Sequence, residues 1–136
     1  MGKSRAVLAL NGIVMMTIGV CFFFLNKQIN IAMFPGIQEN ELAYEIAIIL
    51  RYLMGSGIFT IGMILFLARV SVKSGAQRLL MGSSIGFFII FLTTLFVKYK
   101  FLSVDIPIVG VSIFPILSLL SLYVSTRPYQ EQLLIF

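Results

Sequence analysis

The sequence predicts an all-α fold, an integral membrane antiparallel four-helix bundle, from two observations. Of the 136 residues, 60% are hydrophobic and only 11% are charged, whereas a soluble domain usually has charged side chains at about a quarter of its positions. The hydrophobic residues also form four long runs, each close to the ~20 residues that a helix needs to cross a bilayer. Because backbone amides in lipid must be hydrogen-bonded within their own segment, the runs are expected to be helices.

The four runs place the helices at about residues 6–25, 43–68, 79–97 and 106–125, and residues 1–136 form one transmembrane domain. The first run resembles a signal peptide, because the basic residues Lys3 and Arg5 precede it. However, phenylalanines fill residues 22–24, where small cleavage residues would be expected. We therefore expect the first helix to be retained.

The connections between the helices are predicted to be short. Residues 26–42 are expected to form a polar link, and residues 69–78 a basic loop that turns at Gly75. In the last helix Pro115 lies mid-segment, where a proline removes a hydrogen bond and is expected to kink the helix.

The distribution of basic residues predicts the orientation of the chain. More of them lie at the N-terminus, second loop and C-terminus than in the first and third loops, and basic loops favour the cytoplasmic side. We expect both termini to be cytoplasmic and the membrane to be a bacterial inner membrane. The two sets are Lys3, Arg5, Arg69, Lys73, Arg78 and Arg127 against Lys27, Lys98 and Lys100.

Several kinds of chemistry lack the residues that they require. The chain has no histidine and a single cysteine, Cys21, within an apolar run, so the commonest metal ligand and the usual general base are missing. We expect no cofactor, no metal site and no enzyme activity. The basic residues are scattered rather than clustered with exposed aromatic residues, so nucleic acid is not an expected partner.

Small residues recur with helical periodicity and predict close helix packing, since they allow two backbones to approach in lipid. The last helix adds a stripe of Gly110, Ser118, Ser121 and Ser125. Packing within the chain and dimerisation through one face both remain open. The glycine pairs are Gly12 and Gly19, Gly55 and Gly62, and the Gly-x-x-x-Gly pair Gly82 and Gly86.

Arg51 is the one charged residue well inside a predicted span, where insertion costs roughly 2.5–3.5 kcal/mol at the bilayer centre. Three interpretations remain open. The side chain extends to lipid phosphate or a loop carbonyl, contacts an anion such as a carboxylate, phosphate or lipid headgroup, or pairs with an acid of a partner chain. Within the chain, Glu41 and Asp105 are the candidate acids, and Asn11 is expected to form an interhelical hydrogen bond.

The order of these features resembles the DoxX-like group of small four-helix bacterial membrane proteins, across nearly the whole chain. A glycine-bearing first helix leads to Pro35-Gly36, and acidic residues 39–45 precede Arg51 and the glycine-rich helix that follows. Unlike that group, the chain lacks a membrane glutamate in the fourth helix and a terminal arginine in the third. The resemblance implies a fold more than an activity.

These observations predict a non-catalytic membrane protein, either an accessory or structural subunit or a lipid-associated packing protein. Its expected partners are the lipid bilayer and other membrane subunits or a second copy of itself. The alternative is a small oligomeric transporter or channel for an anionic solute, with Arg51 selecting the anion and the serine stripe near Pro115 lining a path.

Overall fold

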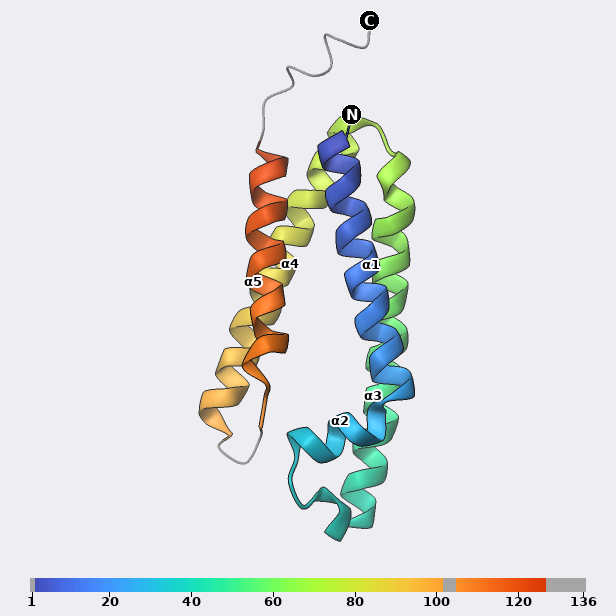
Figure 1. The fold of residues 1–136 in the computed structure, drawn as a ribbon, viewed down its shortest axis with the longest axis vertical. Coiled ribbons are helices and arrows are strands. Elements are labelled where there is room, and N and C mark those ends of the chain that lie inside the picture. The colour runs from blue at the N-terminus through green and yellow to red at the C-terminus, as the bar shows by residue number, and fades with distance from the viewer. Residues whose placement is uncertain (1, 102–104, 127–136) are drawn as a thin grey trace, which may run out of the picture.

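A computed structural model describes residues 2–101 and 105–126. Within these residues the chain is helical apart from short connections and contains no strand (Figure 1). The predicted all-α fold is therefore confirmed. The elements in chain order are α1 (Gly2–Phe24), α2 (Asn26–Met33), the 3-10 turn η1 (Ile37–Glu39), α3 (Glu41–Leu67), the 3-10 turn η2 (Ala68–Val70), α4 (Lys73–Lys100) and α5 (Ile108–Ser125).

Among the described residues, the four helices α1, α3, α4 and α5 are long and apolar enough to cross a membrane. The chain is thus a multi-pass membrane protein. Successive spans run in opposite directions, so the start of α1, η2 and the end of α5 lie at one end of the bundle (top of Figure 1), and α2 and η1 lie at the other. Arg127, one of the basic residues used in the orientation argument, lies outside the described residues.

The basic loop predicted for residues 69–78 is largely helical, which corrects the expected boundary. Helix α4 begins at Lys73, and the turn is made by Ser71 and Val72 in extended conformation. Gly75 therefore lies in the first turns of α4. The hydrophobic run marks where the lipid ends, but the backbone hydrogen bonds of α4 continue beyond it into the interface. In this added part of α4, Ala76 is buried in the protein core.

The link predicted for residues 26–42 contains the short helix α2, which the sequence interpretation missed. Helix α2 crosses the lower end of the bundle instead of continuing α1 (Figure 1). Gly36 has φ 82°, a left-handed conformation that favours glycine, and starts η1. The side chain of Asn40 then caps α3, since its Oδ1 accepts a hydrogen bond from the backbone N–H of Ala43 at 3.2 Å.

The spans pack as two close pairs, α1 with α3 and α4 with α5, and α1 also touches both α4 and α5. Two buried apolar clusters join the pairs: one near the end where α1 begins, around Leu8 and Leu80, and one near the middle, around Met15 and Phe87. Below the second cluster the ribbons of the two pairs diverge (Figure 1). The two clusters therefore lie in the upper and middle parts of the bundle.

Candidate functional site

The glycines of α1 and α3 lie directly against each other and set the distance between these helices. A Cβ built on Gly12 would lie 2.7 Å from the carbonyl oxygen of Gly62, and one built on Gly19 would lie 2.7 Å from that of Gly55. Both pairs belong to one antiparallel register. The faces predicted from periodicity thus meet each other, and their backbones are in van der Waals contact because no side chain separates them.

Gly82 and Gly86 of α4 do not take part in such a contact. Apart from the adjacent backbone of α4 itself, no heavy atom of the described residues lies within 4 Å of a Cβ built on either glycine. Of the two alternatives left open for this Gly-x-x-x-Gly pair, the described residues show no close packing within the chain, and dimerisation through this face stays a prediction. Helix α5 approaches α4 elsewhere, where Ser84 rather than a glycine is buried.

Serine side chains hold α4 and α5 together by reciprocal hydrogen bonds. The hydroxyl of Ser84 donates to the carbonyl oxygen of Ser118 at 2.9 Å, and the hydroxyl of Ser118 donates to that of Ser84 at 2.8 Å. In a neighbouring contact, Nδ2 of Asn11 donates to Oγ of Ser121 at 2.7 Å and links α1 to α5. This is the interhelical bond expected for Asn11. Ser118 and Ser121 of the serine stripe are thus occupied by helix–helix contacts. Ser125 donates within α5 to the carbonyl oxygen of Leu122 at 2.8 Å, and Gly110 is exposed.

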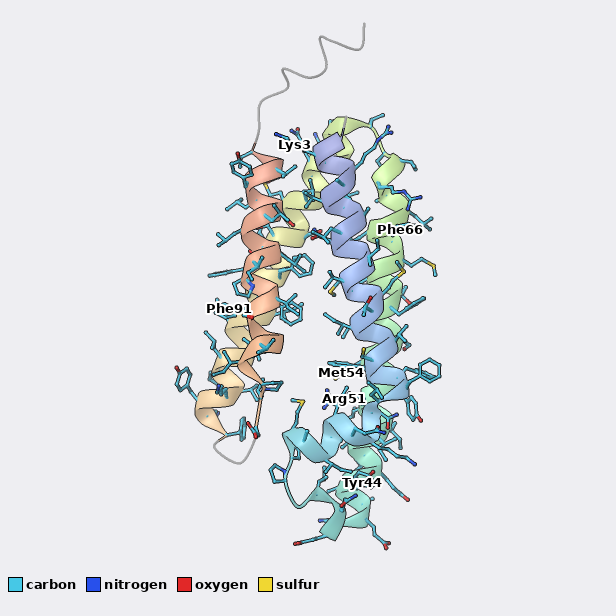
Figure 2. The ribbon with its side chains drawn as sticks, viewed as in Figure 1. Lys3, Tyr44, Arg51, Met54, Phe66 and Phe91 are labelled. Atoms are coloured by element: carbon cyan, nitrogen blue, oxygen red, sulfur yellow. The ribbon has the colours of Figure 1, made fainter. Side chains whose placement is uncertain are left out.

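Arg51 lies on the face of α3 that packs on α1, one turn from Gly55, and only 7% of its surface is exposed. Its Nε and Nη2 donate to Oδ1 of Asn30 at 3.0 and 2.9 Å. Nη2 also lies 3.4 Å from the sulfur of Met33, and the guanidinium carbon lies 4.8 Å from the ring centroid of Phe22. Figure 2 shows Arg51 where α2 meets α3.

Local chain geometry brings Asn30 to Arg51. Helix α1 ends at Phe24, and the buried side chain of Asn26 donates to the carbonyl oxygen of Phe23 at 3.2 Å. The chain then turns into α2, where Asn26 and Asn30 lie four residues apart and face inward together. Asn30 is completely buried, and its Nδ2 has no hydrogen-bond partner among the described residues.

Sequence reasoning identified Arg51 but missed Asn30, which it left within a polar link. The spacing of Asn26 and Asn30 was the available signal, because two asparagines four residues apart share a helix face. The candidate acids for Arg51 are not its partners. Within residues 2–101 and 105–126 Arg51 forms no ion pair, and both Glu41 and Asp105 are exposed. Asp105 instead meets α2 through its backbone, whose N–H donates to the carbonyl oxygen of Met33 at 2.8 Å.

The site therefore combines a buried positive charge with a buried amide donor that has no acceptor. Nδ2 and Oδ1 of Asn30 share one carbon atom, so the amide donor lies beside the guanidinium. Such a pair suits an anionic acceptor. No group of three or more His, Cys, Asp or Glu side chains that could hold a metal ion occurs in the described part of the chain.

Comparisons with protein-family models, curated proteins and solved structures found no match to this chain. The resemblance to the DoxX-like group stays a prediction that depends on the order of features in the sequence.

Proposed function

We propose that this chain is a non-catalytic membrane protein that works through helix packing, either as an accessory or structural subunit of a membrane complex or as a lipid-associated protein. The observation that carries the proposal is that polar side chains inside the spans form hydrogen bonds between helices. Asn11, Ser84, Ser118 and Ser121 bond across helix interfaces, whereas an enzyme needs titratable groups that converge on one pocket.

The outward face of α4 supports association with another membrane subunit or a second copy. It carries Gly82 and Gly86 next to exposed apolar residues such as Ile85 and Ile89. Small residues between apolar ones let a second helix approach closely in lipid. The same composition is found in helices that meet only lipid tails. An experiment therefore distinguishes a face of α4 that binds another chain from one that contacts lipid.

The experiment is purification of the tagged chain from its native membrane in mild detergent, followed by mass spectrometry and measurement of the particle mass. We expect a second subunit, a second copy or retained lipid. Gly82→Leu should reduce a protein assembly to the single chain, because it fills the open face of α4 without an internal clash. Gly57→Leu is the matched control, since Gly57 on α3 is equally open. A monomer that carries neither protein nor lipid would refute the proposal.

A second candidate, an oligomeric transporter or channel for an anionic solute, is favoured by one observation: Arg51 is buried and has no acidic partner among the described residues. Ser118 and Ser121, two of the serines expected to line its path, are bonded to other helices, which weakens this candidate. Anion flux into liposomes tests it. Flux by the natural chain that Arg51→Leu abolishes would establish the transporter, and the leading proposal expects no flux from either form.

We further propose a bacterial inner membrane and cytoplasmic termini. The basic residues at the start of α1 and around η2 lie at the same end of the bundle as the end of α5. Basic residues on one side of a membrane favour its cytoplasmic face.

A further inference from the structure

The charge of Arg51 has no counter-ion within the described part of the chain. Its three neighbours are a neutral amide oxygen, a thioether sulfur and an aromatic ring, contributed by Asn30, Met33 and Phe22. A buried charge that is not paired is destabilising, because the surrounding groups replace its hydration only in part. An anion held against the guanidinium would remove much of this cost.

A second, independent observation concerns the amide of Asn30. Because Arg51 can only donate, Oδ1 of Asn30 must face the guanidinium, and Nδ2 remains a donor. That donor is fully buried and lacks an acceptor among the described residues, although buried donors are nearly always satisfied. An oxyanion beside Arg51 would accept from Nδ2 and from the guanidinium together.

The depth of the site indicates where this oxyanion comes from. In the register set by the glycine pairs, Arg51 lies opposite Phe23, next to the end of α1 at Phe24. The polar residues Asn26 and Lys27 follow immediately. Arg51 is thus about one helical turn, roughly 5 Å, inside the boundary where α1 leaves the hydrocarbon. The headgroup layer of a bilayer begins at that boundary, and an arginine side chain can extend over such a distance.

We propose that Arg51 and Asn30 bind the phosphate of an anionic phospholipid in the leaflet next to α2. One phosphate oxygen accepts from the guanidinium and another, or the same one, from Nδ2 of Asn30. A net negative headgroup is preferred over a zwitterionic one, because the cation of a zwitterionic headgroup offsets the charge of its phosphate and is repelled by the guanidinium. This goes beyond helix packing, which would need no selectivity for a headgroup.

The test is native mass spectrometry of the detergent-purified, lipid-depleted chain in equal amounts of phosphatidylglycerol and phosphatidylcholine of identical acyl chains. We expect about a tenfold preference for phosphatidylglycerol, the discrimination typical of one charge-assisted hydrogen bond. Arg51→Met keeps a long apolar side chain and should reduce the preference to about twofold or less. Lys27→Gln is the matched control: it removes an exposed charge at the same end of the bundle and should retain the preference.

Asn30→Asp provides a second test that keeps the arginine. It places a carboxylate where Oδ1 now lies, 2.9–3.0 Å from Nε and Nη2, so the chain supplies its own counter-ion. The variant should unfold at a higher temperature than the natural chain in phosphatidylcholine and lose its response to phosphatidylglycerol. It remains informative if Arg51→Met fails to fold.

Three results would overturn the proposal. Equal binding of both lipids by the natural chain would show that it has no selectivity. A preference that survives both Arg51→Met and Asn30→Asp would show that the lipid site lies elsewhere. Stabilisation by inorganic phosphate alone, without lipid adducts, assigns the site to a free anion. None of these results affects whether the chain copurifies with another subunit, so the proposed function is tested separately.

Discussion

Replacing Gly62 by alanine should separate α1 from α3, and the matched change at Gly57 should not. Both glycines lie on α3, five residues apart. A Cβ at Gly62 would lie 2.6 Å from the backbone nitrogen of Met16 and 2.7 Å from the carbonyl oxygen of Gly12, whereas a Cβ at Gly57 would meet nothing within 4 Å. The two changes are chemically identical and differ only in what the new methyl group contacts.

The size of the effect follows from these distances. Ordinary contacts between heavy atoms are about 3.5–4.0 Å, so the two helices must separate by roughly 1 Å because backbone atoms cannot rotate away. Overpacking of this kind costs about 1–3 kcal/mol. Alanine gains up to about 1 kcal/mol over glycine in a helix at either position. This gain cancels in the comparison, and Gly62→Ala should be less stable than Gly57→Ala by about 1–3 kcal/mol.

Titration of the helical protein with SDS in mixed micelles, followed by circular dichroism, measures the two unfolding free energies. Gly12→Ala should repeat the loss seen at Gly62, since the same backbones meet there. Equal stability of Gly62→Ala and Gly57→Ala would refute the close crossing of α1 and α3, and with it the register that places Arg51 opposite Phe23.

Arg51→Lys should lower the thermal unfolding midpoint in lipid nanodiscs, because one ammonium group cannot reproduce the Nε and Nη2 pair on Asn30; an unchanged midpoint would mean that Arg51 only extends to the interface. Ser121→Ala should cost about 1 kcal/mol of unfolding free energy in the same SDS titration, since Nδ2 of Asn11 loses its buried acceptor; a cost near zero would show that this bond contributes nothing. Reporter fusions at the two ends of the chain should both be active in the cytoplasm, and an external signal at either end would overturn the proposed orientation.

The spans could be predicted from the sequence because lipid imposes a length and a composition on them. The helix ends were less predictable. Lys73 and Gln77 are polar, and polarity marks where lipid ends rather than where a helix ends, so α4 begins earlier than its apolar run suggests. Helix α2 was missed for a related reason, since eight residues of mixed polarity carry too little periodicity to be distinguished from a loop.

The candidate site was half predictable. Arg51 is conspicuous because a charge within an apolar run needs an explanation, but Asn30 lies in a polar segment where asparagine is ordinary. Only the turn after α1 brings the two together. The glycines show the same limit. Periodicity indicates which residues share a helix face, but not whether another helix covers that face: α1 covers the face of Gly55 on α3, whereas the face of Gly82 on α4 is open.

The central position of α1 has a consequence for biosynthesis. Of the four spans described above, this helix is synthesised before the other three, and it packs on α3 and also reaches α4 and α5. Its asparagine, Asn11, must remain in lipid without Ser121 until α5 has been inserted. A ribosome-bound chain that ends after α3 should already hold the glycine contact, so docking of α5 against Asn11 is a later step than the pairing of α1 with α3.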